Sequence, residues 1–240
     1  MTVLVVGATG ATGRRLVGQL LDRGLSVRAI VRTSGNLPEA LERDKRLSVI
    51  RADVLAIGDA ELARHVEGCG AVASCLGHNL TWKGLFGPPR RLVTDATRRL
   101  CAAIRTNRPT TPTRFVLMNT AGNSNRDLHE PMSFGQTCVI GLLRLLLPPH
   151  TDNEQAADHL RVSIGQRDPH IEWAVVRPDN LIDAEQVTEY DAHPSPTRSA
   201  IFDAGTTSRI NVAHFMAELI TDDVIWKRWK GRMPVIYDRA

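Results

Sequence analysis

The stretch VLVVGATGATGRRLVGQLL, residues Val3–Leu21, carries three equally spaced glycines, Gly7, Gly10 and Gly13. A β-branched run typical of a buried strand precedes the glycines, and apolar residues at helical spacing follow them. Glycines in such a turn permit a tight exit from the strand, let the backbone approach a pyrophosphate and allow the helix to pack closely on the sheet. The stretch therefore predicts a dinucleotide-binding turn, with a turn that needs only small residues as the alternative.

Strand-like and helix-like segments alternate along the rest of the chain. Further strands are expected at 26–32, 47–54, 70–77, 114–122 and 171–178, and helices near 37–43, 60–67, 92–107, 153–166 and 212–219. Such alternation predicts an α/β protein, a parallel sheet with helices on both faces, in one domain. Irregular segments at 81–90, 123–134 and 183–198 follow strands, so we expect them to build a pocket at the carboxyl edge of the sheet.

The composition is typical of a globular protein, since 42% of the 240 residues are hydrophobic and 23% are charged. The net charge of +4 and the spread-out excess of arginine fit an anionic small ligand at least as well as nucleic acid. The four cysteines show no zinc-ligand spacing, so we expect no metal site and a cytoplasmic setting. Because a strand is expected directly after Met1, we expect no signal peptide.

Two short runs have functional alternatives. WKRWKGR, at 226–232, mixes aromatic and basic residues as some single-strand binders do, but a helix end with its tryptophans packed inward is the simpler interpretation. The apolar run at 139–147 fits a pocket lid or core packing, and we expect core packing. It is too short for a bilayer, which takes about 20 apolar residues. The expected partner is a small-molecule substrate, with no nucleic acid and no membrane.

The end of the second expected strand indicates which dinucleotide binds. An NAD site places an acid there, about 20 residues beyond the glycines, to hold the ribose 2′-hydroxyl. Here the strand ends at Arg32, followed by Thr33 and Ser34, and no acid occurs before Glu39. Arg32 can pair with a 2′-phosphate through two donors, and Arg14 could reach the same group. We therefore expect NADP(H) rather than NAD, although Arg32 could simply be solvated.

The ends of the third and fourth strands predict further contacts with the dinucleotide. Asp53 could accept a hydrogen bond from the adenine amine while Val54 packs on the ring, but a turn aspartate is nearly as good an interpretation. Cys75, Leu76 and Gly77 are expected where the backbone passes the pyrophosphate and the nicotinamide ribose. A buried cysteine in this position is more typical of a small core residue than of a nucleophile.

GATGATG, VRAIVRTSGNLP, VIRADVLAIGDAELARHVEGCGAVASCLG and WAVVRPDNLID together resemble the atypical short-chain dehydrogenase/reductase family. They look like its NmrA-like branch, which includes NADPH-dependent flavin and biliverdin B reductases. The resemblance implies a Rossmann-like doubly wound fold over residues 1–240, with a cofactor half at about 1–122 and substrate-pocket elements mainly at 123–240. The cofactor residues it implies are Gly7, Thr9, Gly10, Ala11, Thr12, Gly13, Arg32, Thr33, Ser34, Asp53, Val54, Thr120 and Pro178.

The chain departs from the family at the Tyr-x-x-x-Lys pair that supplies the proton in standard members. Neither of its two tyrosines has a lysine four residues on. In the family's register, Pro149 stands where the tyrosine would be and Asn153 where the lysine would be. Two functions remain open: a reductase of acceptors that need little acid catalysis, such as a flavin, a quinone or a conjugated carbonyl, and a non-catalytic NADP(H) sensor.

Three residues are candidates for catalytic roles, each with a structural alternative. Thr120 could donate to a substrate oxygen or bond the backbone at a strand end. His78 could donate a proton or be an ordinary loop histidine. Asn153 could hold ribose hydroxyls or cap a helix, and Asp152 has the same ambiguity. Family relatives occur as monomers and homodimers, so both states stay open.

Overall fold

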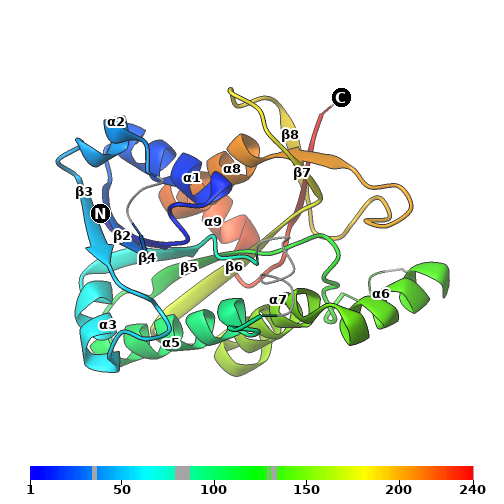
Figure 1. The fold of residues 1–240 in the computed structure, drawn as a ribbon, viewed down its shortest axis with the longest axis horizontal. Coiled ribbons are helices and arrows are strands. Elements are labelled where there is room, and N and C mark those ends of the chain that lie inside the picture. The colour runs from blue at the N-terminus through cyan, green and yellow to red at the C-terminus, as the bar shows by residue number, and fades with distance from the viewer. Residues whose placement is uncertain (34–36, 79–86, 129, 131–133, 240) are drawn as a thin grey trace.

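The computed structural model describes residues 1–33, 37–78, 87–128, 130 and 134–239. Within this part, eight strands form one sheet in the order β3-β2-β1-β4-β5-β6-β10-β8 (Figure 1). Their bounds are β1 (Thr2–Val6), β2 (Ser26–Val31), β3 (Leu47–Arg51), β4 (Cys69–Ser74), β5 (Thr113–Met118), β6 (Ile171–Pro178), β8 (Tyr190–His193) and β10 (Val235–Asp238). All neighbouring pairs are parallel except β10 and β8. The order of the first six strands is that of a Rossmann fold, as the resemblance implied.

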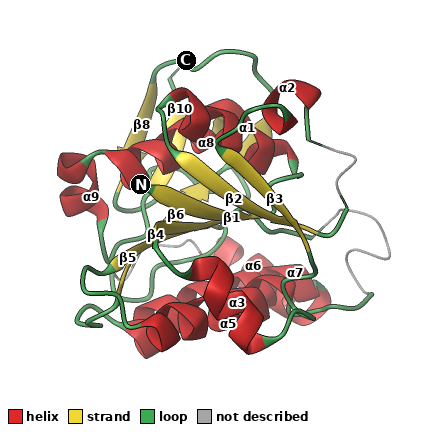
Figure 2. Ribbon diagram, turned by 90° about the vertical axis from the view of Figure 1, so that its left-hand side faces the viewer, coloured by secondary structure: helices red, strands yellow, loops and turns green. Residues whose placement is uncertain are grey.

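Helices cover both faces of the sheet (Figure 2). The helices are α1 (Ala11–Asp22), α2 (Glu39–Glu42), α3 (Asp59–Val66), α5 (Leu92–Asn107), α6 (Phe134–Leu146), α7 (Pro148–Asp158), α8 (Arg209–Thr221) and α9 (Asp223–Trp229). A π-helical turn, His159–Ile164, continues α7, and two short strands, β7 (Asn180–Ile182) and β9 (Thr206–Ser208), pair outside the main sheet. Helices α1, α8 and α9 pack on one face, and α3, α5 and α7 pack on the other.

Strand β1 shows why the sheet is buried on both sides. Val3 and Val5 pack with the α1 and α8 residues, whereas Leu4 and Val6 pack with the α3 and α5 residues. All four side chains are at most 1% exposed. Because successive side chains of a strand point to opposite faces, a continuous apolar run is required when both faces are covered. The expected single α/β domain is confirmed.

The helix expected at 153–166 begins earlier than the sequence suggested. Pro148 closely follows the end of α6 at Leu146 and is the first residue of α7. Proline is accepted in the first turn of a helix because its missing N–H has no intrahelical partner there. Asn153 therefore lies inside α7 and is not a helix cap.

The apolar run at 139–147 is only partly a core segment. It lies in α6, where Ile140 is buried but Leu142 and Leu146 are 55% and 54% exposed. Arg144 reaches from α6 to Glu154 on α7 with both Nε and Nη2. Burial opposes the charged form of Glu154, but its contacts with His150 and Arg144 outweigh burial and lower its pKa to about 2. The core-packing expectation was wrong for the two exposed leucines.

A buried ion pair fastens the insertion that follows β5. Arg177 of β6 is fully buried, and its Nη2 lies 2.6 Å from Oε1 of Glu130, whose side chain is 3% exposed. The same guanidinium donates to the backbone oxygens of Asn123, Pro194 and Met233. One side chain thus joins β6 to three irregular segments at the carboxyl edge.

The tryptophans of the 226–232 run point inward, as expected. Trp226 and Trp229 are each 3% exposed, and the Trp226 indole N–H donates to Glu172. None of the helices in the described residues is long and apolar enough to cross a membrane.

Candidate functional site

The turn after β1 brings two segments of backbone into direct contact. Gly7 has a φ of +75°, and a Cβ there would lie 2.6 Å from the carbonyl carbon and oxygen of Cys75. A Cβ on Gly13 would lie 2.1 Å from the oxygen of Gly7. Only glycine allows this positive φ and these approaches at no steric cost. In this turn, residues 7–13, no side chain stands in front of the backbone. We call it the glycine cradle.

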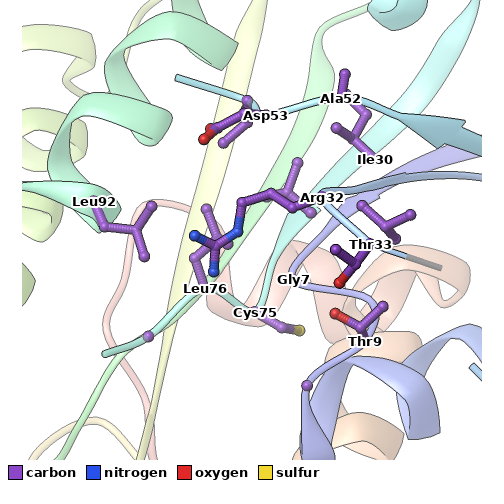
Figure 3. Close-up of a pocket in the computed structure, with 15 residues that line it drawn as sticks. Gly7, Thr9, Ile30, Arg32, Thr33, Ala52, Asp53, Cys75, Leu76 and Leu92 are labelled. Carbon is purple, nitrogen blue, oxygen red and sulfur yellow. The ribbon is translucent and has the colours of Figure 1, made fainter. Parts of the chain in front are cut away.

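This turn lies at the point where the strand order reverses, between β1 and β4. Ligands of open α/β sheets bind outside the carboxyl ends of the strands at this point. A cavity of about 260 Å³ opens there (Figure 3). It is lined by Val6, Gly7, Thr9, Gly10, Ile30, Val31, Arg32, Thr33, Ala52, Asp53, Val54, Cys75, Leu76, Gly77 and Leu92. The cavity therefore brings together the ends of β1, β2, β3 and β4.

Arg32 supplies the positive charge of the cavity. Its side chain extends into the middle of the pocket, with Thr9 and Thr33 on one side and Asp53 and Leu92 on the other (Figure 3). It forms no hydrogen bond or ion pair with the part of the chain that the structure describes. The first acid after β2, Glu39, is paired with Arg43 instead. An arginine without a carboxylate partner in a cavity is suited to an anionic ligand.

At the end of β3, Asp53 makes a turn contact and also lines the cavity. Its Oδ1 accepts a hydrogen bond from the Leu55 N–H at 2.8 Å, which is a turn contact. The same residue lines the cavity together with Val54, which is 5% exposed. The turn contact leaves the second carboxylate oxygen to face a ligand.

Cys75 lines the cavity as part of the wall. Its Sγ lies 3.9 Å from the sulfur of Met216 inside the core. Burial raises the pKa of the Cys75 thiol to about 12. Because the thiolate is the nucleophilic form, this thiol is unsuited to covalent chemistry near neutral pH.

His78 is not an ordinary loop histidine. Its Nε2 lies 2.7 Å from Oδ2 of Asp152 on α7, and the two side chains are 5% and 0% exposed. The Asp152 carboxylate also accepts the backbone N–H groups of Val93 and Thr94, at the start of α5. Asp152 therefore caps another helix, a role that the sequence did not reveal.

The segment after β5 is bonded to α7 through Asn119 and to β6 through Ala121. The Asn119 amide donates to the Asn153 backbone oxygen at 2.9 Å, while the Asn153 side chain bonds no described residue. The Thr120 hydroxyl accepts from the Gly122 N–H at 3.3 Å, so its own proton is available to another acceptor. Pro178, at the end of β6, accepts from the Ala121 N–H.

The structure thus divides the residues expected from the sequence into groups. Those that line the cavity are Gly7, Thr9, Gly10, Arg32, Thr33, Asp53, Val54, Cys75, Leu76 and Gly77. Those that do not line it are Ala11, Thr12, Gly13, His78, Thr120, Asn153 and Pro178. Ser34 lies outside the described residues. Sequence reasoning missed Val6, Ile30, Val31, Ala52 and Leu92, although their positions at strand ends and at a helix start were a usable signal.

The two tyrosines of the chain lie away from the cavity. Tyr190 and Tyr237 both lie outside the cavity lining. The Tyr190 hydroxyl is 2.8 Å from Nδ1 of His214, and burial raises the Tyr190 pKa. Both tyrosines belong to strands on the far side of β6 from the glycine turn.

Comparisons with known proteins agree with this geometry. A model of the NAD(P)H-binding family matches residues 7–223. A curated relative, an uncharacterised chloroplastic protein of Arabidopsis thaliana, is 48% identical over 52 residues, which is 22% of this chain. The match spans only 19% of that relative's length.

Solved structures with the same fold cover the whole chain. A short-chain dehydrogenase/reductase from Veillonella parvula, in complex with NADP, is 13% identical with a TM-score of 0.71 and covers 100% of this chain and 95% of its own. ChuY, an anaerobillin reductase from Escherichia coli O157:H7, is 16% identical with a TM-score of 0.68 and covers 99% and 97%. A Streptococcus pneumoniae protein provisionally named an NADH-flavin reductase is 18% identical with a TM-score of 0.65 and covers 100% of both chains.

At these identities the solved structures establish the fold, and the family model establishes the family. The matched region contains the glycine turn and every residue that lines the cavity except Val6. The chain belongs to the NAD(P)H-binding family.

Proposed function

We propose that the protein is an NADP(H)-dependent oxidoreductase that reduces a small conjugated or aromatic acceptor, such as a flavin, a quinone, an enone or a carbonyl. The observation that carries this proposal is the pairing of the glycine cradle with Arg32 in one cavity. The cradle fits a pyrophosphate, and Arg32 fits a phosphate beside it. When bound, NADPH supplies a hydride to the acceptor.

Arg32 is the basis for choosing NADP(H) over NAD(H). It stands at the end of β2, where an NAD site holds the ribose with an acid. Arg14, in the first turn of α1, is exposed and also bonds no described side chain. A 2′-phosphate would receive charge-assisted hydrogen bonds from Arg32 and a hydroxyl contact from Thr33. The Veillonella neighbour's complex with NADP is consistent with this assignment.

Three side chains are proposed to act in place of the family's tyrosine and lysine. Asn153 presents from α7 an amide that bonds no described residue, and this amide would hold ribose hydroxyls. Thr120 would donate its hydroxyl proton to an acceptor oxygen, and His78, held by Asp152, would supply a proton near the end of β4. None of these groups is a strong proton donor for the alkoxide that forms when a simple ketone is reduced. Acceptors that delocalise the incoming charge are therefore favoured. The names of ChuY and of the Streptococcus neighbour support such acceptors.

Replacing Arg32 with alanine is expected to weaken NADPH binding about ten- to a hundredfold while leaving NADH binding unchanged, because a charge-assisted contact to a phosphate contributes about 1.5–3 kcal/mol. Fluorescence titration of each nucleotide measures the two dissociation constants. Arg43→Ala is the matched control, since this arginine is paired with Glu39 away from the cavity. Equal losses for both nucleotides in the Arg32 variant would contradict the 2′-phosphate assignment.

The reductase proposal is tested by following nicotinamide absorbance with NADPH and a panel of flavins, quinones and enones. Oxidation above the background rate with at least one acceptor class is expected. The absence of a Tyr-Lys pair favours one competing function, a protein that senses NADP(H) without turnover. Tight NADPH binding with no oxidation by any acceptor would select the sensor. The NmrA-like branch, a cytoplasmic location and a monomeric or homodimeric state remain predictions.

A further inference from the structure

Asp152 is a meeting point of three parts of the fold. It is 2% exposed, and its carboxylate accepts from Val93 N–H at 2.8 Å, Thr94 N–H at 2.9 Å and His78 Nε2 at 2.7 Å. The Thr94 hydroxyl donates in turn to the Asp152 backbone oxygen at 2.8 Å. One buried residue of α7 is therefore bonded to the loop after β4 and to the start of α5.

The donors that meet at Asp152 adjoin the cavity directly. His78 follows Gly77, and Val93 follows Leu92, and both Gly77 and Leu92 line the cavity. Asp152 itself does not line the cavity. Asn119, directly after β5, donates to the backbone oxygen of the next residue, Asn153. The segment Asp152–Asn153 is thus held from both β4 and β5.

The Asp152–Asn153 segment and the residues bonded to it, His78, Val93, Thr94 and Asn119, are called the frame below. The position of this frame indicates which half of the cofactor it serves. Arg32 and Asp53 mark the adenosine end of the cavity under the proposed function. A dinucleotide crosses the crevice along the carboxyl ends of the strands. Its second half must therefore continue from Gly77 toward the end of β5, where Asn153 and Thr120 lie.

The charge of Asp152 matters for the frame. Burial opposes the charged form, but the hydrogen bonds from His78, Thr94 and Val93 outweigh it and lower the pKa of Asp152. Oδ2 serves both His78 and Val93, whereas Oδ1 serves Thr94. An asparagine has one acceptor oxygen, so its NH₂ group would face donors at the position of Oδ2.

We propose that Asp152 is a positioning residue for the nicotinamide half of the cofactor: it holds His78 and the Asn153 segment of α7 against the ends of β4 and β5. The inference rests on the proposed NADP(H) site and adds to it. The frame takes over the anchoring of the nicotinamide side in a chain that has proline and asparagine in place of tyrosine and lysine.

The test compares NADPH with 2′,5′-ADP, which carries the adenosine and the 2′-phosphate but no nicotinamide. Asp152→Asn is expected to weaken NADPH binding roughly tenfold more than 2′,5′-ADP binding, because a buried donor left unpaired disorders the frame locally. Dissociation constants from calorimetry or fluorescence give the ratio. An unchanged ratio, whether both affinities fall or neither does, would overturn the inference.

Asp168→Asn is the matched control. Asp168 also accepts two backbone N–H groups, those of His170 and Ile171, and pairs with one basic side chain, Arg105. It precedes β6, at the opposite edge of the sheet from the cavity. General loosening of the fold should therefore appear in both variants, whereas the change in ratio should appear only in Asp152→Asn.

Thr94→Val decides the question if Asp152→Asn does not fold. Valine keeps the shape of the buried threonine and removes only its bond to the α7 backbone. A loss of NADPH affinity about threefold larger than the loss of 2′,5′-ADP affinity supports the frame, and equal losses overturn it.

The test of the frame measures only nucleotide binding, so its result is independent of whether the protein reduces an acceptor. A wild-type protein that binds NADPH but reduces no acceptor contradicts the reductase and leaves the frame supported by the ratio. A wild-type protein that binds 2′,5′-ADP as tightly as NADPH has no nicotinamide subsite, which overturns the frame alone.

Discussion

Alanine in place of Gly13 is expected to weaken NADPH binding about a hundredfold or more. The new Cβ would lie 2.1 Å from the Gly7 oxygen, 2.8 Å from the Gly7 carbonyl carbon and 3.0 Å from the Ala8 Cα. All three are backbone atoms, so no side-chain rotation can relieve the clash, and α1 must move away from the turn. Because the cradle depends on this close packing, the amide groups would no longer meet the pyrophosphate. Nucleotide titration measures the loss, and thermal unfolding reports any loss of stability.

Gly18→Ala is the control for Gly13→Ala in the same helix. A Cβ on Gly18 meets only the Leu41 side chain, at an ordinary contact distance of 3.7 Å. Alanine is favoured over glycine inside a helix by roughly 0.5–1 kcal/mol, so this variant should bind NADPH normally and unfold at the same or a higher temperature. Normal NADPH affinity in Gly13→Ala would mean that the turn does not seat the pyrophosphate.

The second large effect is expected from Glu130→Gln, which removes the partner of a buried charge. The Arg177 side chain is 0% exposed, and its ion pair with Glu130 is excluded from water. Leaving a buried charge without its partner costs about 3–5 kcal/mol. Urea unfolding is expected to show a loss of this size. The remaining bonds of Arg177 are to neutral backbone oxygens, which cannot replace a carboxylate.

An exposed ion pair of similar length serves as the comparison for Glu130→Gln. Arg198 and Asp203 are also 2.6 Å apart, but their side chains are 49% and 62% exposed. Solvent screens such pairs, so Asp203→Asn is expected to leave the unfolding midpoint almost unchanged. Equal, small shifts in the two variants would show that water reaches Arg177 in solution and that the insertion is not fastened by this pair.

The sequence predicted the elements whose signals are local. The strand before Gly7, the helix after Gly13 and the positive residue at the end of β2 are each read within a few positions. Steric limits at glycine and the periodicity of apolar residues act over the same short range. For this reason the fold class, the cradle and most of the cavity lining were predicted, whereas the start of α7 was missed because the proline that closely follows α6 is the first residue of α7.

The contacts that complete the site depend on packing between distant segments. His78 and Asp152 are 74 residues apart, and Arg177 and Glu130 are 47 apart. Nothing in the sequence around Asp152 distinguishes a residue that caps its own helix from one that caps α5. That choice depends on which face of α7 meets α5 once both pack on the sheet. The sequence by itself thus determined a dinucleotide cradle with an arginine at the end of β2, and only the tertiary structure decided which buried carboxylates hold the surrounding segments, because a charge can be buried only where folding brings its partners together.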